Sequence, residues 1–367
     1  MERKFLATLI LVAMALGAGC ADILPGPPVA LPAIVPVEGA SLDPLPAHTF
    51  PFEGGEETIR IDPDPAVYAG AKGADRRLHL ARDLSGEEWI PLYYRAFESE
   101  PHLEPFYADL LAALRDIRDR EGLDDDRYLE LIAVFVQSIP YRTDASIVEP
   151  KFPIETYVDR EGDCDDRSLL LAGLLAREGY GVALFYFEDE AHMAVGVQST
   201  GCHYRNTSLA YVETTNVSYV GIPPLALSSG AVLSSDPFVI PVGDGPRLYT
   251  GCDQIETIER ALSSSLARAG ALAPELAART RDIEAERESL EAFGTRLKAL
   301  SRDGEFLEYN RLVPEYNRKA REYNDAVQAY NALLAESRAA VDLHNHLVTH
   351  ACDRPGSYLR ARAYLAG

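Results

Sequence analysis

The sequence predicts an α+β protein in which a helix packed on an antiparallel sheet is followed by a long antiparallel α-helical hairpin. Three observations support this prediction. Residues 165–177 are apolar nearly all round, which is typical of a central, buried helix. Residues 182–187, 191–197 and 209–215 have the pattern of three strands separated by polar turns. From Cys252 onward, apolar residues instead recur every seven positions.

The N-terminal residues predict a targeting segment. Arg3 and Lys4 precede an uncharged apolar run over residues 5–19, which has the length of a signal h-region. Small residues before Cys20 are similar to a lipoprotein processing site, so we expect Cys20 to be the lipidated residue. Simple signal cleavage and an uncleaved anchor are the alternatives. Lipidation would hold the exported protein on the extracytoplasmic face of the cell membrane.

Composition divides the chain into five segments. Residues 1–20 are the expected signal peptide and lipid-attachment site, and the proline-rich residues 21–55 predict an extended linker. We expect the α+β domain over 56–250, the helical hairpin over 251–353 and a C-terminal tail over 354–367.

The net charge limits the partners of this protein. A formal charge of −22 argues against binding nucleic acid, because phosphate contacts need a basic surface. It also argues against a polybasic contact with anionic lipid, which leaves the lipid on Cys20 as the expected membrane attachment.

Two heptad registers predict the hairpin. The first contains Ile255, Leu262, Ala269, Leu276, Ile283, Leu290 and Leu297, and the second contains Val313, Ala320, Val327, Leu334, Val341 and Val348. The break at Asp303-Gly304 predicts the turn between two antiparallel arms. We expect Pro274 and Pro314 to kink or interrupt the arms.

The hairpin also suggests a disulfide. Cys252 and Cys352 each lie 50 residues from position 302, beside the predicted turn, so both would lie at the base of the hairpin. Export permits a disulfide between them. Pairing with Cys202 is the alternative.

Cys164 is the candidate nucleophile. It follows Gly162-Asp163 at the start of the buried helix, where the helix dipole and free backbone N–H groups favour a thiolate and can hold an oxyanion. An inert, buried cysteine is the alternative interpretation.

A nucleophilic cysteine needs a base and a group that orients the base. His192 lies near the start of the middle predicted strand and Glu213 lies in the last one. A symmetric turn between these strands would place them directly opposite each other. Ala194 and Gly196 share the face of His192, and we expect these small residues to let the Cys164 helix approach.

These residues resemble the transglutaminase-like superfamily of cysteine peptidases and acyltransferases. The resemblance covers about residues 90–225 and is carried by Phe135–Tyr141, Pro153–Thr156, Gly162–Asp166, His192–Val197 and Tyr211–Thr215. It implies a papain-like core with Cys164, His192 and Glu213 as the catalytic residues. The family more often has Asp at the acidic position, and Glu lengthens that arm by one methylene. By analogy with the family, Gln137 is a candidate oxyanion donor, with capping of its helix as the alternative.

The sequence predicts no metal site and no cofactor. Asp163, Asp165 and Asp166 could hold a cation, but carboxylates in a first helical turn more often stabilise the helix. His346 and His350 share a helical face without an evident third ligand.

Two functions follow from these observations. The first is an exported thiol hydrolase that cleaves or transfers peptide or amide acyl groups through Cys164, His192 and Glu213, with a protein or peptide as substrate. The second is a catalytically silent lipoprotein scaffold that binds a protein partner through its hairpin. The hairpin could also regulate access to the site.

Overall fold

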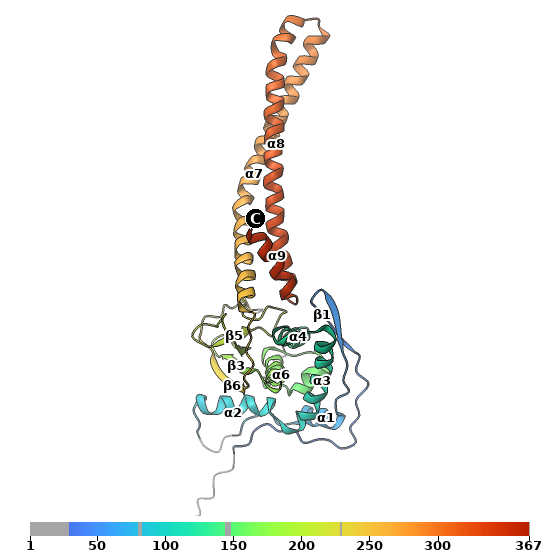
Figure 1. Cartoon of the computed structure of the whole chain (residues 1–367), viewed down its shortest axis with the longest axis vertical. Helices are drawn as coiled ribbons and strands as arrows, with labels where there is room; N and C mark the ends of the chain where they lie inside the picture. Colours follow the sequence, from blue (N-terminus) through green and yellow to red (C-terminus); the bar gives the residue numbers. More distant parts are fainter. Residues whose placement is uncertain (1–28, 80–82, 144–147, 228–229, 367) are drawn as a thin grey trace, which may run out of the picture.

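The computed structural model describes residues 29–79, 83–143, 148–227 and 230–366. Cys20 and the expected targeting segment lie outside these residues. The described chain combines α-helices with antiparallel sheets and ends in long helices, which confirms the mixed α and β class (Figure 1). Within these ranges, no helix is both long enough and apolar enough to cross a membrane.

The described residues form six strands, nine α-helices and one 3₁₀ turn. The strands are β1 (His48–Phe52), β2 (Gly55–Ile59), β3 (Gly181–Phe187), β4 (His192–Gln198), β5 (Leu209–Val212) and β6 (Phe238–Asp244). The α-helices are α1 (Pro65–Gly73), α2 (Gly86–Glu98), α3 (Glu104–Glu121), α4 (Asp125–Gln137), α5 (Pro153–Asp159), α6 (Cys164–Arg177), α7 (Cys252–Arg302), α8 (Phe306–Thr349) and α9 (Arg354–Ala366), and a 3₁₀ turn spans Pro101–Leu103.

A four-stranded antiparallel sheet, in the order β5-β4-β3-β6, forms the centre of the domain. Helix α6 covers one face of this sheet, and α3 and α4 lie on the far side of α6 (Figure 1). Burial explains the apolar character of α6, since Leu169, Leu170 and Leu171 are fully inaccessible to solvent. The helix approaches α3 closely at Gly173, where an added Cβ would collide with the hydroxyl of Tyr107.

The folded domain begins earlier than the expected boundary at residue 56. Residues 48–52 form β1, which pairs with β2, and its alternating pattern buries Phe50 and Phe52. The Phe50 ring meets the ring of Phe135 on α4 edge-on, with centroids 5.6 Å apart. Ile34 is also buried. The proline-rich segment is therefore partly core, because its scattered apolar residues cover α4 and α1 rather than facing water.

Helices α7 and α8 form the predicted hairpin, which projects from the domain (Figure 1). Every member of the first heptad register is at least half-buried. The second register is not maintained near the base, where Val341 and Val348 are 40% and 55% exposed. Ala340, Leu343 and Leu347 are buried there instead, because α8 turns a different face toward α9 and the domain.

The prolines do not interrupt the hairpin. Of the kink or interruption that we expect at each proline, the interruption does not occur, because helix α7 continues through Pro274 and α8 continues through Pro314. Both prolines lie on the exposed side of their helices, so the hydrogen bond that each removes leaves a carbonyl that water can reach.

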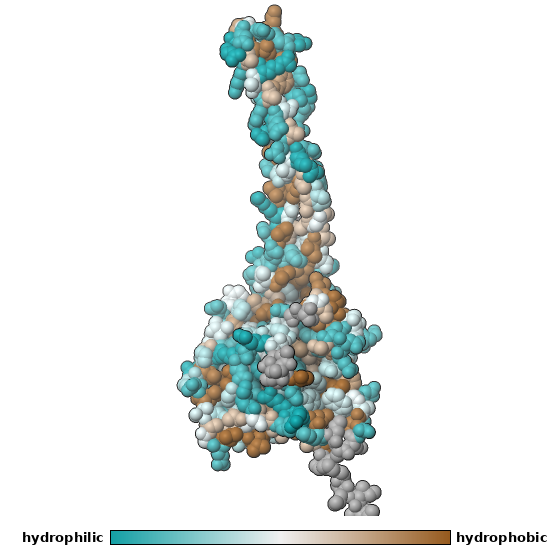
Figure 2. Space-filling model, turned by 180° about the vertical axis from the view of Figure 1, so that it is seen from behind, coloured by the Kyte–Doolittle hydropathy of each residue, from teal (hydrophilic) through white to brown (hydrophobic). Residues whose placement is uncertain are grey.

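The segment expected to be a C-terminal tail is the helix α9, which packs against α7 and α8 near the base of the hairpin (Figure 1). Its first residue anchors it: Arg354 Nε lies 2.5 Å from the Glu130 carboxylate on α4, and both side chains are buried. Apolar surface near this junction continues up the lower part of the hairpin (Figure 2).

The expected Cys252–Cys352 disulfide is wrong, and the alternative pairing is found. Cys202 and Cys252 form the disulfide, with a sulfur–sulfur distance of 2.06 Å. The reason lies at the start of α7, where Cys252 packs against Gly201 in the loop between β4 and β5. Cys352 lies in the turn between α8 and α9 and is a free thiol, and its carbonyl accepts a hydrogen bond from the N–H of Glu53 after β1.

Candidate active site

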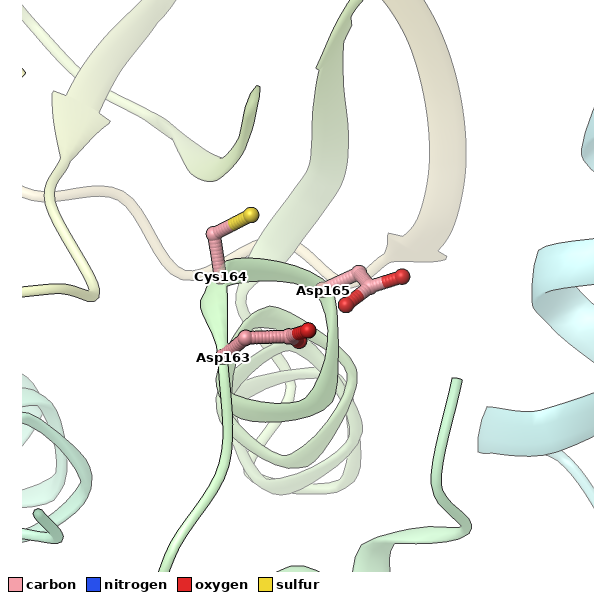
Figure 3. A group of neighbouring side chains, drawn as sticks. All are labelled: Asp163, Cys164 and Asp165. Carbon is pink, nitrogen blue, oxygen red and sulfur yellow. The ribbon is translucent and has the colours of Figure 1, made fainter. Parts of the chain in front are cut away.

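Cys164 is the first residue of α6, as the sequence predicts, and Asp163 caps the helix. The Asp163 carboxylate accepts a hydrogen bond from the N–H of Asp166, and the Asp166 carboxylate accepts one from the N–H of Asp163. This reciprocal cap fixes the first turn of the helix. Figure 3 shows that the sulfur of Cys164 points away from the helix axis, with Asp163 and Asp165 around the same turn.

The surroundings of Cys164 keep its thiol protonated. Burial, together with the neighbouring carboxylates of Asp165 and Asp163, raises the pKa of Cys164 to about 12. Backbone hydrogen bonds from Met193 and Asp165 act in the opposite direction but do not outweigh burial. Burial and these carboxylates therefore outweigh the effect of the helix N-terminus, which we expect to favour the thiolate.

The hydrogen bond with the Met193 backbone brings the thiol to the start of β4, where His192 is the preceding residue. His192 is 5% exposed and stacks against Phe187, its partner across the β3–β4 turn, with ring centroids 6.1 Å apart. The Tyr211 phenol, which contacts His192, also lies within electrostatic range of Cys164. The structure thus gathers the predicted nucleophile and the predicted base at one end of the sheet.

The side chain of Tyr211 lies between His192 and Glu213. His192 Nε2 is 3.1 Å from the Tyr211 hydroxyl, which in turn donates a 2.8 Å hydrogen bond to Glu213 Oε2. Burial, and then the Glu213 charge, raise the pKa of Tyr211 well above its usual range, so the phenol keeps its proton. Because that one proton goes to Glu213, the phenol oxygen accepts from Nε2–H. This network leaves Nδ1 of His192 as the basic nitrogen.

The β4–β5 register differs from the expected one. Val195 pairs with Val212 and Gly196 pairs with Tyr211, so His192 and Glu213 are not directly opposite, and Glu213 follows the last residue of β5. The glutamate nevertheless reaches the histidine, with Oε2 3.7 Å from Nε2. The added methylene of Glu spans the diagonal distance and leaves room for the phenol.

Glu213 is held as a carboxylate although it is 1% exposed. Its Oε1 accepts hydrogen bonds from the N–H of Thr214 and from both the N–H and the hydroxyl of Thr215, at 2.7–2.9 Å. Burial alone would raise the pKa of Glu213, but the contact with His192 and the Thr215 hydrogen bonds outweigh it and lower the pKa to about 2. The acid is therefore fixed in both position and charge.

Gln137 is not directed at the thiol. Its Nε2 donates to the carbonyl oxygens of Glu213 (2.7 Å) and Ser218 (3.3 Å), and its Oε1 accepts from the N–H of Ser218 (3.2 Å). The expected role as oxyanion donor is therefore wrong, because the amide is bound to the backbone of another loop. The alternative role as helix cap is also wrong, because Ser138 is the C-cap of α4. The amide is fully occupied by the loop that carries Glu213.

The opposite face of β4 packs on α6. Met193 and Val195 belong to the core that contains the α6 leucines, and the hydroxyl of Ser168 on α6 contacts the Met193 carbonyl at 3.3 Å. Ala194 and Gly196 pack against Phe185 on the other face instead. The expected role of these two small residues is therefore wrong, because α6 packs on the other face of β4.

Two acidic side chains, those of Asp163 and Asp165, lie close to the sulfur of Cys164. One ligand atom each from Asp163, Cys164 and Asp165 lies within 4.8 Å of the others. Burial, then a hydrogen bond to Asp163 and the neighbouring carboxylates, raise the pKa of Asp165 well above its usual range. His346 and His350 stack with centroids 4.0 Å apart, and no further ligand joins them in the part of the chain that the structure describes.

Sequence reasoning missed Tyr211, Thr215 and Arg167. Tyr211 could have been found, because it shares the face of Glu213 two positions along the same strand. Arg167 gave no sequence signal, yet it is fully buried and donates to the carbonyl oxygens of Thr215 and Gln137. It ties the end of α4 to the loop after β5.

The chain matches no family model, no curated protein and no solved structure. The assignment of these residues to a site rests on their geometry.

Proposed function

We propose that this protein is a thiol hydrolase that cleaves or transfers peptide or amide acyl groups, with Cys164 as nucleophile and His192 as general base. The observation that carries the proposal is the buried chain of hydrogen bonds from His192 through Tyr211 to Glu213, with the Tyr211 phenol within electrostatic range of the Cys164 thiol. The order of the three residues, with Cys164 at the start of a central helix, His192 on β4 and Glu213 directly after β5, supports the likeness to the transglutaminase-like superfamily and its papain-like core.

The first step forms a thioester. Nδ1 of His192 takes the thiol proton while the sulfur attacks the carbonyl carbon, and the imidazolium then returns the proton to the leaving amine. The N–H groups of the first turn of α6 have no acceptor within the helix, so that of Cys164 is suited to stabilise the oxyanion. Glu213, in contact with His192 through Tyr211, orients the imidazole in this step.

The second step releases the acyl group. Water gives a proton to His192 and attacks the thioester carbonyl, which yields a carboxylic acid and restores the thiol. An amine in place of water would give a new amide, and the product depends on which acceptor reaches the thioester.

The raised pKa of Cys164 favours a general-base mechanism over a preformed ion pair. At neutral pH the thiol of the free protein is protonated, because its pKa is about 12. The proton therefore moves to His192 as the substrate reacts. A substrate that shields the Asp163 carboxylate would lower this barrier, since that carboxylate contributes to the raised pKa of Cys164.

Acyl-enzyme trapping tests the proposal. The protein is mixed with p-nitrophenyl acetate, quenched in acid and mapped by mass spectrometry, with Cys164→Ala as the control. We expect one acetyl group on Cys164 that His192→Ala fails to acquire. Equal acetylation of Cys164 in wild type and in His192→Ala would contradict the proposal that His192 is the general base.

A scaffold without catalysis is the second candidate, and the raised pKa of Cys164 is the observation that favours it. In this case the fold presents the hairpin to a protein partner. Export and lipid attachment through Cys20 belong to both proposals, because they rest on the N-terminal sequence alone. Failure to trap an acyl group, together with a protein partner that binds wild type and Cys164→Ala equally, would favour the scaffold.

A further inference from the structure

The two ends of the loop that carries Glu213 are joined by a backbone hydrogen bond. It leaves β5 after Val212 and returns at Gly221, whose N–H donates a 2.7 Å hydrogen bond to the carbonyl of Tyr211. Glu213 begins this loop and Tyr219 lies near its end, and both are buried, at 1% and 5% exposure. Because the loop is short and its ends are joined, a displacement of Tyr219 is expected to move Glu213 as well.

Gln137 bridges the two sides of this loop. Its amide binds the carbonyl of Glu213 on one side and both the N–H and the carbonyl of Ser218 on the other. The side chain is 4% exposed, so these backbone groups have little access to water. Loss of the amide would leave buried polar groups without partners, which is the costly case for a hydrogen bond.

Tyr219 connects the same loop to the base of the hairpin. Its hydroxyl donates to the carbonyl of Leu347 on α8 at 2.8 Å and lies 2.8 Å from the hydroxyl of Ser357 on α9. It also lies 3.4 Å from the carbonyl of His350, at the end of α8. The buried phenol of Tyr219 thus joins the loop that carries Glu213 to α8 of the hairpin and to α9, which packs near the base of the hairpin.

We propose that Gln137 and Tyr219 are positioning residues that connect the base of the helical hairpin to the Glu213 carboxylate. The connection runs from α8 and α9 through Tyr219 and Ser218 to the Gln137 amide, and from there to the backbone of Glu213. A partner that moves α8 against α9 would act on the acid that orients His192. An effect of this connection on catalysis rests on the proposed function, whereas its effect on the ionisation of Glu213 can be measured without any activity.

The test is the ionisation of Glu213, which a merely structural contact would leave unchanged. Its pKa of about 2 depends on the contacts with His192 and Thr215 that fix the carboxylate. The protein is labelled with ¹³C-glutamate and titrated by NMR, and Glu213→Gln identifies the resonance. Tyr219→Phe removes the hydroxyl but keeps the ring, and Gln137→Met removes the amide at similar volume.

The matched control is Tyr330→Phe, which removes a hydroxyl from α8 about 25 Å further along the helix from Leu347. We expect the Glu213 carboxyl of wild type and of Tyr330→Phe to remain ionised at pH 3. In Tyr219→Phe and Gln137→Met we expect its midpoint to rise above pH 3, because the carboxylate leaves some of its donors. Ser357→Ala, a milder change, provides the same test if Gln137→Met does not fold.

An unchanged Glu213 titration in the folded Tyr219→Phe and Ser357→Ala variants would overturn the proposal. A change in Gln137→Met alone would also overturn it, because the hairpin would then have no part in placing the acid. Trapping of an acyl group on Cys164 reports separately on the proposed function. The two ideas therefore fail on different measurements.

Discussion

Replacing Glu213 with Gln should reduce the loss of unfolding free energy that wild type shows as the pH falls. The Glu213 carboxyl has a pKa of about 2 in the folded protein, against 4.5 for an unperturbed glutamate. A lowered folded-state pKa contributes stability that is fully present above the unfolded pKa and is lost as pH falls toward the folded pKa. The difference corresponds to about 3 kcal/mol at neutral pH, of which about 2 kcal/mol is lost between pH 5 and pH 3.

Urea unfolding at pH 5, 4 and 3 measures this loss directly. Other carboxylates contribute to the slope in both proteins, so the informative quantity is the difference in unfolding free energy between wild type and Glu213→Gln. We expect that difference to shrink by about 2 kcal/mol from pH 5 to pH 3. Parallel curves for the two proteins would refute the reasoning, because they would mean that Glu213 ionises alike in the folded and unfolded chain.

Three further predictions follow from the same structure. Gly173→Ala should destabilise the protein by about 1–3 kcal/mol in urea unfolding, because the new methyl group meets a buried tyrosine hydroxyl of α3; Gly270→Ala, in open space on α7, should be neutral or stabilising. Tyr211→Phe should slow acylation of the nucleophile roughly 10-fold at pH 7, since it removes one hydrogen bond to a charged group; an unchanged rate would mean that the phenol has no part in orienting the base. Alkylation of the unreduced, denatured protein should label Cys352 and spare the Cys202–Cys252 pair, and breaking that bridge, which closes a separation of 50 residues, should cost about 4 kcal/mol.

The sequence was informative wherever a pattern is local. The apolar run after Cys164 predicted α6 to within a residue, and the heptads after Cys252 predicted both arms of the hairpin. The break at Asp303-Gly304 likewise ended α7 where the turn was expected. These features depend on residues close together in the chain, which is why periodicity and helix-end signals suffice to find them.

The sequence was misleading wherever distant segments meet. The symmetry of the hairpin favoured Cys252–Cys352, but contact between the start of α7 and the loop at Gly201 decides the pairing. Likewise, Gln137 was assigned to the oxyanion, whereas its partners lie more than 70 residues away, in the loop after β5. Neither contact leaves a periodic signal, so only the folded chain reveals it.

The central claim is that His192 activates Cys164, and alkylation of the native protein by iodoacetamide tests it most directly. The rate at Cys164 is measured by mass spectrometry from pH 5 to pH 9 in wild type and in His192→Ala. The account predicts that wild type reacts at least roughly 10-fold faster at pH 7, because the imidazole accepts the thiol proton that burial otherwise retains. Equal rates in the two proteins, rising only at alkaline pH, would contradict the account and leave Cys164 an inert, buried thiol.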